Sequence, residues 1–295
     1  MNVLISGSSG LVGRHLMRLL RASGHRVIQL VRREARSADE RSWDPASGRL
    51  DASVLDGVHA VVNLAGDNIA SGRWTDAKKK RILESRIQTT GLLADTIAAS
   101  PNKPEVFVSA SAIGFYGNRG EEVLSETSSS GGGFLADVCG QWEVAAMRAG
   151  IRTVLTRFGV ILAAEDGALA KMKLPFKLGV GGRVGDGKQY WSWVTIDDVV
   201  RVILFALTNK SLSGPINVVA PQPVTNAEFT RVFGSVLHRP TVFPMPAFAA
   251  RIALGEMADE MLLSSARVVP SKLQAAGYQF QHPDLRGGPI AELNG

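Results

Sequence analysis

The sequence predicts an α/β fold, a doubly wound parallel sheet with a smaller, mostly helical C-terminal lobe. Short apolar runs alternate with helix-like segments through the first two-thirds of the 295 residues. This alternation is typical of right-handed βαβ units. The first run, 2–6, leads directly into a glycine-rich turn at 7–13. The pattern changes after about residue 165, to a glycine-rich stretch at 179–187 and then a proline-punctuated, helical region from Pro221.

The apolar runs and periodic segments place the individual elements. We expect strands near 2–6, 26–31, 59–64, 105–110, 152–158 and 215–219. We expect helices at 11–23, 76–99 and 134–149. Trp43-Asp44 marks the end of a short further strand, and Gly24 and Gly150 are suited to left-handed caps after the first and third helices.

Composition excludes several classes of protein. A hydrophobic content of 45% with 20% charged residues is that of a chain with a substantial core. The net charge of +6 is scattered, and its one dense run, 78–81, is expected to be a solvated helix face, so we expect no nucleic-acid partner. The single Cys139 excludes an internal disulfide or a cysteine metal cluster, and the five histidines lack metal-ligand spacing. With no secretory signal and no membrane span expected, the predicted location is the cytoplasm.

The turn after the first strand has the form of a dinucleotide phosphate site. Gly7 and Gly10 allow a tight turn and close approach to a pyrophosphate, and Gly13 allows the helix to pack on the strand. Free N–H groups at the helix start, near Ser9 and Leu11, point at the anion. A glycine-rich turn without a ligand is the alternative, but the flanking strand and helix favour binding.

The end of the second strand indicates which dinucleotide is bound. Arg32 and Arg33 stand where an NAD site would place an acid on the ribose 2′-hydroxyl. A guanidinium suits a phosphate, so NADP(H) is predicted, with NAD as the less favoured cofactor. The alternative is that one or both arginines are merely solvated at the exit of the strand.

Two later strand ends complete the predicted Rossmann site. Small residues at Leu64, Ala65 and Gly66 let a dinucleotide lie against the backbone. The segment 109–117 sets two hydroxyls, Ser109 and Ser111, and a phenol at a strand's carboxyl end. We therefore expect an NAD(P)-binding domain over residues 1–170, returning at about 194–220, and a small lobe over 171–193 and 221–295.

These segments together carry a family resemblance. The quoted motifs are Ser6-Gly7-Ser8-Ser9-Gly10-Leu11-Val12-Gly13, Asn63-Leu64-Ala65-Gly66, the 109–117 segment and Trp193-Val194-Thr195-Ile196-Asp197-Asp198. With them the chain resembles the extended short-chain dehydrogenase/reductase superfamily. Trp43-Asp44-Pro45, Trp142-Glu143 and Leu254-Gly255-Glu256 resemble its atypical "epimerase family protein" branch, whose members generally lack an assigned substrate. The resemblance implies homodimers through the 76–99 and 134–149 helices as a common arrangement.

The chain departs from the superfamily at its catalytic pair. In typical members a Tyr-x-x-x-Lys pair supplies the proton, but here those positions fall on Leu135 and Cys139. The upstream serine is retained as Ser111. In one alternative mechanism, the proton comes from Tyr116 or from a water held by Ser111 and Arg86. Packing beside the nicotinamide is the favoured alternative for Tyr116.

Other residues carry weaker expectations. Arg86 either pairs with a local acid or holds a cofactor or substrate phosphate, and Cys139 is expected to be a buried small hydrophobe. Asp197-Asp198 is expected to cap the helix that starts at Val199. An anionic substrate site could be lined by Arg183, Lys188, Gln189, Trp191 and Trp193.

The sequence supports one principal function and two alternatives. The principal one is an NADP(H)-dependent oxidoreductase or epimerase-like enzyme acting on a small polar or phosphorylated substrate. A non-catalytic NADP-binding sensor or scaffold is the second, favoured by the missing Tyr-x-x-x-Lys pair. An ordinary nucleotide-sugar epimerase is the third, and Leu135 at the tyrosine position argues against it.

Overall fold

A computed structural model describes residues 1–286 of the chain, and its centre is a seven-stranded sheet. The strand order is β11-β7-β5-β4-β1-β2-β3, and each neighbouring pair is parallel. The order reverses between β1 and β4, as in a doubly wound sheet. The strands are β1 (Asn2–Ser6), β2 (Arg26–Val31), β3 (Glu40–Ser42), β4 (Ala60–Asn63), β5 (Val106–Ala112), β7 (Thr153–Phe158) and β11 (Gly214–Val218).

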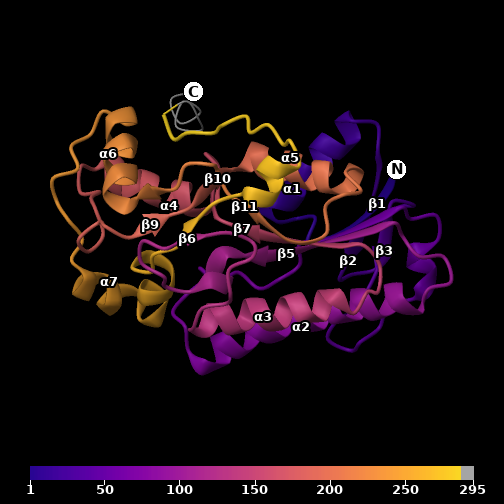
Figure 1. Ribbon diagram of the computed structural model, residues 1–295. Helices are drawn as coiled ribbons and strands as arrows, with labels where there is room; N and C mark the ends of the chain where they lie inside the picture. Colours follow the sequence, from indigo (N-terminus) through magenta and orange to yellow (C-terminus); the bar gives the residue numbers. More distant parts are fainter. Residues whose placement is uncertain (287–295) are drawn as a thin grey trace.

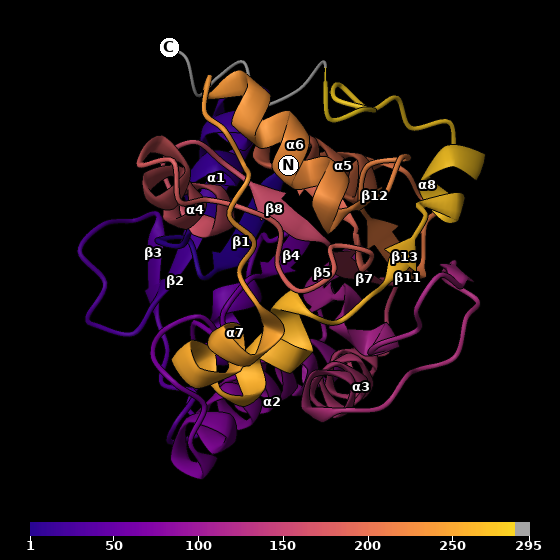
Figure 2. The same ribbon diagram turned by 90° about the vertical axis from the view of Figure 1, so that its left-hand side faces the viewer.

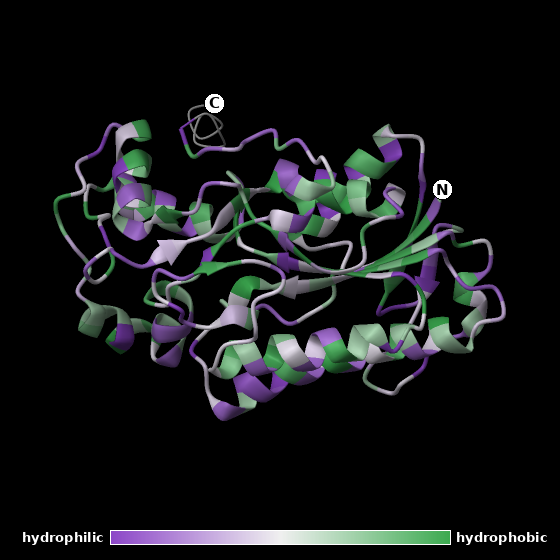
Figure 3. Ribbon diagram, in the orientation of Figure 1, coloured by the Kyte–Doolittle hydropathy of each residue, from purple (hydrophilic) through white to green (hydrophobic). Residues whose placement is uncertain are grey.

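Helices cover both faces of this sheet (Figure 1). Helices α1 (Leu11–Ala22) and α5 (Ile196–Thr208) lie on one face, and α2 (Asp76–Ala99) and α3 (Phe134–Met147) on the other. The inner strands β1 and β4 are buried and largely apolar, as parallel strands covered on both faces are, whereas the edge strand β3 is polar and partly exposed. Side chains alternate between the layers: Val3 and Ile5 join the core under α1 and α5, and Leu4 joins the core over α2. Figure 3 shows the mainly apolar strands between helices that carry both polar and apolar residues.

The predicted fold class and the main elements are confirmed. Strands at 2–6 and 26–31 and the helix at 76–99 have the predicted bounds, and the other predicted strands and helices differ by at most two residues at an end. The strand expected to end at Trp43-Asp44 is the edge strand β3. Its pairing with β2 completes one side of the sheet.

A smaller lobe stands at the carboxyl end of the strands (Figures 1 and 2). It contains α4 (Gly167–Lys177), α6 (Asn226–Val236), α7 (Ala247–Leu254), the π-helical turn Ala258–Leu262 and the antiparallel pair β9 (Tyr190–Trp191) and β12 (Val224–Thr225). The parallel pair β8 (Val160–Leu162) and β10 (Trp193–Thr195) joins it to the sheet domain. An aromatic core holds the lobe together, with Phe229 and Phe233 buried between Phe176 and Trp191.

The C-terminal segment does not stay in this lobe as predicted. Strand β13 (Arg267–Val268) pairs with β6 (Val123–Leu124), and α8 (Ser271–Ala275) places Leu273 in the core beneath α5. We predicted that all of 221–295 belongs to the lobe. Residues 267–275 instead lie against the sheet domain, because apolar side chains there complete the main core. Residues 287–295 lie outside the described part of the chain.

Asp198 has a different role from the predicted helix cap. The side chain that caps α5 is Thr195, whose Oγ1 accepts from the Asp198 N–H at 3.1 Å. The Asp198 carboxylate is fully buried and accepts from the backbone N–H groups of Gln281 (2.9 Å) and His282 (3.0 Å) and from the Tyr278 hydroxyl (3.1 Å). Asp198 thus fastens the C-terminal segment to the sheet domain. Among residues 1–286, no helix combines the length and the apolar character needed to span a membrane.

Candidate functional site

The glycine turn after β1 has the geometry of a phosphate cradle. Gly7 has φ +71°, and a Cβ there would stand 2.6 Å from the Leu64 carbonyl carbon. A Cβ at Gly13 would stand 2.4 Å from the Gly7 oxygen. Gly10 begins α1 with no side-chain cap, so the first N–H groups of the helix receive no side-chain acceptor. The backbone therefore packs tightly and leaves donors for an anion.

The end of β4 is tied to this turn through Asn63. Its Oδ1 accepts from the Ser6 hydroxyl at 2.6 Å, and its Nδ2 donates to the Thr90 hydroxyl at 2.7 Å. Because Asn63 is fully buried, these bonds fix the end of the strand and the loop that carries Leu64, Ala65 and Gly66. Ser109 is also fully buried, and its Oγ faces Asn63 Nδ2 at 3.5 Å. The position of Ser109 therefore supports β4, and a direct contact of its side chain with the cofactor is not supported.

The two arginines after β2 differ in their partners. Arg33 forms a bidentate pair with Glu40 at 2.7 and 2.8 Å, and this pair holds the pKa of Glu40 at about 2. Arg32 is exposed, and its side chain has no hydrogen bond or ion pair within residues 1–286. Arg32 is thus the one of the pair available for a 2′-phosphate, whereas Arg33 already has a counter-ion.

A cavity of about 410 Å³ lies between the sheet domain and the lobe. We call it the main cavity. It begins at Leu11 in the first turn of α1 and extends to Arg86 on α2 and Trp191 on β9. Most of its lining is apolar, and in the described chain Arg86 and Glu260 are its only charged side chains. The lining also includes Ile69, Ile82, Ala112, Ile113, Gly114, Leu135, Val138, Cys139, Trp142, Phe158, Val160, Ile161, Gly167, Tyr190 and Ser192.

Arg86 lies in the wall of this cavity without a carboxylate partner in the described chain. Its Nη1 donates to the backbone oxygens of Asp67 (3.1 Å) and Ile82 (3.0 Å), and its guanidinium carbon lies 5.0 Å from the ring centre of Trp142. Burial lowers the pKa of Arg86. Of the two predicted alternatives, pairing with a local acid is wrong, because the Asp67 carboxylate binds Lys78 Nζ at 2.6 Å.

Leu135 and Cys139 both line the main cavity, at the positions where the resemblance places a tyrosine and a lysine. Burial raises the pKa of the Cys139 thiol to about 11, so the thiol stays protonated near neutral pH. The expected role of Cys139 as a buried small side chain agrees with its 2% exposure. Leu135 has no proton to donate and the protonated Cys139 thiol carries no positive charge, so the two residues do not reproduce the tyrosine–lysine pair.

The predicted catalytic positions of Ser111 and Tyr116 need correction. The Ser111 hydroxyl donates to Glu143 Oε1 at 2.7 Å, and Glu143 forms a bidentate pair with Arg157 at 2.7 and 2.8 Å. Arg157 donates to the Tyr116 hydroxyl at 2.9 Å, which in turn donates to Asn217 Oδ1 at 2.7 Å. We call these five residues the buried network.

The buried network lies outside the main cavity, and none of its five side chains is more than 10% exposed. Burial raises the pKa of Tyr116, which is fully enclosed. Packing of Tyr116 beside a nicotinamide is not supported either. Ser111 and Tyr116 therefore have a structural role, because their hydrogen bonds link β5 and the turn after it to α3 and β11.

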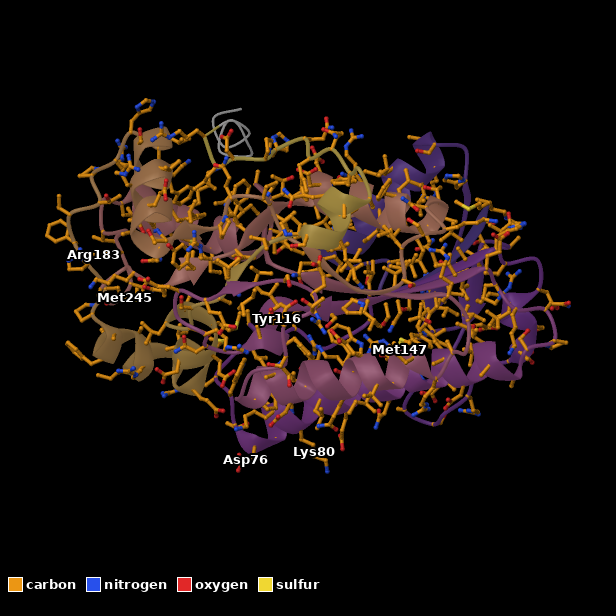
Figure 4. The ribbon with its side chains drawn as sticks, in the orientation of Figure 1. Asp76, Lys80, Tyr116, Met147, Arg183 and Met245 are labelled. Atoms are coloured by element: carbon orange, nitrogen blue, oxygen red, sulfur yellow. The ribbon has the colours of Figure 1, made fainter. Side chains whose placement is uncertain are left out.

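The predicted substrate residues separate into three environments. Trp191 lines the main cavity. Gln189 is buried, and its Nε2 donates to the backbone oxygens of Val184 and Leu262 at 3.0 Å each. Arg183 lines a different cavity, with Thr230 and Val242, and Figure 4 shows it at the far end of the lobe. Of the five predicted residues, which also include Lys188 and Trp193, only Trp191 lines the main cavity.

Two contacts that sequence patterns do not reveal close the lobe over the main cavity. The Glu260 carboxylate accepts from the N–H groups of Phe134 (3.2 Å) and Leu135 (3.3 Å) at the start of α3. Lys79 binds Glu256 at 2.9 Å. The partners are more than 120 residues apart, so spacing gives no signal for them. The solvated face expected for the 78–81 run holds for Lys80 and Arg81, which are exposed, whereas Lys78 is buried at 4% exposure and Lys79 binds the lobe.

The architecture and the glycine cradle define the class of protein. A doubly wound sheet whose switch point carries an uncapped glycine turn is a dinucleotide-binding fold of the Rossmann type. No group of residues suited to a metal ion occurs within residues 1–286.

Comparison with known proteins identifies the family. The NAD dependent epimerase/dehydratase family matches residues 3–219, and a domain of unknown function, DUF1731, matches 245–287. The chain belongs to the NAD dependent epimerase/dehydratase family. An epimerase family protein of Mycobacterium leprae is 46% identical over 283 residues, which cover 95% of this chain and 92% of that protein.

Two solved structures share the whole fold. The crystal structure of human epimerase family protein SDR39U1 (isoform 2) with NADPH matches with a TM-score of 0.90 at 34% identity, covering 99% of each chain. A nucleoside-diphosphate sugar epimerase from Corynebacterium glutamicum matches with a TM-score of 0.83 at 38% identity, covering 99% of this chain and 58% of that one. The predicted family resemblance is thus confirmed.

Proposed function

We propose that this protein binds NADP(H) along the glycine turn and the end of β4, and catalyses hydride transfer between the cofactor and a small carbonyl or hydroxyl compound in the main cavity. The observation that carries this proposal is the continuity of the site. The cavity starts at Leu11, next to the glycine cradle, and runs under the closed lobe to Trp191. A cofactor bound at the cradle can therefore present its reactive end to an enclosed space.

The residues present suit NADP(H). Gly7 and Gly13 have no room for a Cβ, the first turn of α1 has no side-chain cap, and Arg32 is exposed and unpaired within the described chain. In the human relative the bound dinucleotide is NADPH. We propose that Arg32 binds the 2′-phosphate and that Leu64, Ala65 and Gly66 contact the cofactor through the β4 loop.

NADPH, when bound, supplies a hydride, and the chain must supply the rest of the chemistry. During reduction the carbonyl carbon gains the hydride, the C=O π bond breaks, and the oxygen gains a proton. Cys139 is a poor candidate for the proton, because burial raises its pKa to about 11 and so disfavours the thiolate that proton transfer would leave. Tyr190 is a phenol that lines the cavity, with the Arg267 guanidinium 4.9 Å from its ring centre. We propose Tyr190 as the proton donor in place of the missing tyrosine.

The experiment is a calorimetric titration of the protein with NADPH, NADP⁺, NADH and NAD⁺, followed by NADPH oxidation assays with a panel of carbonyl compounds. We expect tight binding of the two phosphorylated forms and turnover with at least one carbonyl. Arg32→Glu should weaken NADPH far more than NADH, whereas the matched Arg33→Glu should act less selectively. An equal loss for both cofactors in Arg32→Glu would contradict the 2′-phosphate assignment.

The same assays separate the alternatives. Tight NADPH binding without turnover of any carbonyl would favour the sensor or scaffold protein. Turnover that needs Tyr190 should fall by about 10² or more in Tyr190→Phe, since positioned acids contribute factors of this order. A cytoplasmic location is part of the proposal, although one plant relative is named as chloroplastic.

A further inference from the structure

The main cavity combines an apolar lining with one basic side chain. Ile82, Leu135, Val138, Phe158 and further apolar residues line the cavity together with Arg86, and no other Lys or Arg of the described chain reaches it. Arg86 is partly buried, and a cation that loses hydration in apolar surroundings is costly unless something compensates for it. The chain provides only partial compensation, through two backbone oxygens on Nη1.

The guanidinium leaves one edge for a ligand. Both hydrogens of Nη1 are used by Asp67 and Ile82, whereas Nε and Nη2 donate to no acceptor within residues 1–286. Both atoms keep some exposed surface, and Arg86 is one of the residues that line the cavity. Nε and Nη2 present two parallel N–H groups, the arrangement that matches the two oxygens of a carboxylate.

The nearby acidic groups do not satisfy this edge. The carboxylate of Asp67 is bound by Lys78 Nζ at 2.6 Å. The carboxylate of Glu260, the other charged group of the lining, accepts from the two N–H groups at the start of α3. A cation–π contact with Trp142 and the two backbone acceptors on Nη1 restrict the guanidinium before a ligand arrives. The site is therefore preorganised for one external anion.

The remaining lining limits the size and charge of that ligand. A nucleoside diphosphate carries two phosphate groups and needs several donors, but Arg86 is the single cation available here. Arg183, the other predicted anion ligand, lines a separate cavity. The apolar walls at Phe158, Val160 and Trp191 instead suit a hydrocarbon body. This disagrees with the polar or phosphorylated substrate expected from the sequence.

We propose that Arg86 binds the carboxylate of an otherwise apolar oxo acid or hydroxy acid, which is the substrate class of the enzyme. That the bound acid is a substrate rests on the proposed function. That Arg86 binds a carboxylate rests on the geometry of the cavity alone. Arg86 acts as a specificity-determining residue, and the apolar walls hold the rest of the molecule.

The test uses a matched pair of probes, 4-phenylbutanoate and 4-phenylbutanamide, which have the same shape and differ in charge. Their affinities are measured calorimetrically with and without saturating NADPH, for the unmodified protein and for Arg86→Gln, Arg86→Lys and the control Arg183→Gln. UDP-glucose is the competitor that represents a nucleotide sugar. Thermal unfolding shows whether each variant is folded.

We expect the unmodified protein and Arg183→Gln to bind the carboxylate at least about tenfold more tightly than the amide. Charge-assisted hydrogen bonds are stronger than neutral ones, and the difference corresponds to about this factor in affinity. Arg86→Gln should bind the two probes equally, Arg86→Lys should keep part of the preference, and UDP-glucose should not compete. NADPH affinity should be unchanged in Arg86→Gln.

Several results would overturn the inference. These are equal affinities of both probes for the unmodified protein, no binding of either probe, a preference that survives in Arg86→Gln, or competition by UDP-glucose. Loss of NADPH binding in Arg86→Gln would assign the guanidinium to the cofactor instead. Failure of the unmodified protein to bind NADPH would contradict the proposed function alone, since the carboxylate preference without cofactor is read independently.

Discussion

The two ends of the main cavity are built in different ways. At the cofactor end the backbone forms the site: a glycine turn, a helix start and the loop after β4. At the opposite end side chains from α2, α3 and the lobe form it, above all Arg86, Trp142 and Glu260. The glycine turn and helix start of the first end follow from local geometry, with the β4 loop joined to them through Asn63, whereas the second end depends throughout on side chains from distant segments. A local substitution should therefore affect the first end through the backbone and the second through its supporting side chains.

The largest loss of stability is expected in the buried network, whose Glu143 lies on α3, one of the helices that form the second end. Glu143→Ala leaves Arg157 buried without its carboxylate, and breaking such a pair costs about 3–5 kcal/mol of unfolding free energy. Chemical denaturation monitored by tryptophan fluorescence measures this loss. The control is Glu122→Ala, which breaks the more exposed Arg119 pair and should cost about 1 kcal/mol or less. A similar small loss for both variants would show that the buried network does not support the fold.

A comparable test applies to the cofactor end. Gly13→Ala places a Cβ within 2.4 Å of the Gly7 oxygen, and relieving this overlap requires backbone movement costing about 3 kcal/mol. We expect reduced thermal stability together with weaker NADPH binding. Gly140→Ala is the matched control, because Gly140 lies in α3 with nothing within 4 Å of its added Cβ. Unchanged NADPH affinity in a folded Gly13→Ala protein would contradict the cradle.

Tyr116→Phe distinguishes a structural role of the phenol from a role as proton donor. The hydroxyl lost in this variant bonds Arg157 and Asn217 inside the protein, so we expect a loss of about 1–2 kcal/mol in unfolding free energy. NADPH affinity and the pH profile of turnover should stay the same, because the phenol lies outside the cavity. A fall in turnover by orders of magnitude at unchanged stability would restore the catalytic role predicted from the sequence.

The sequence predicted one end of the site far better than the other, and the structure explains why. Gly7, Gly13 and the flanking strand and helix are neighbours along the chain, so a local pattern carries their geometry. Ser111 and Tyr116 also belong to a recognisable segment, but their side chains turn toward Glu143 and Arg157, which lie up to 41 residues away. Strand position gives the face on which a side chain lies, but not the partner that takes its hydrogen bond.

The same limit applies to charged residues. The sequence predicted a solvated position for Lys78 in the basic run and a helix-capping role for Asp198 in the acidic pair. Both are buried, because each finds partners that a linear pattern does not contain: Asp67 and Asn68 for the lysine, and the backbone at 281–282 for the aspartate. The C-terminal segment 267–275 returned to the main core for a similar reason, since Leu273 fills a position beneath α5.

The smallest expected effect is a change in the pKa of Glu40, and it distinguishes Arg32 from Arg33 at the cofactor end. The pKa of Glu40 is about 2 because Arg33 binds it, whereas Arg32 has no acidic partner in the described chain. A lowered folded-state pKa gives stability that is present above the ordinary value of 4.5 and is lost as the pH falls toward 2. Arg33→Gln should raise the pKa of Glu40 toward its ordinary value, measured by NMR titration of the carboxyl carbon, and Arg32→Gln should leave it unchanged. A shift of Glu40 in Arg32→Gln would mean that both arginines share the carboxylate, and Arg32 would then lose its distinction as the free phosphate ligand.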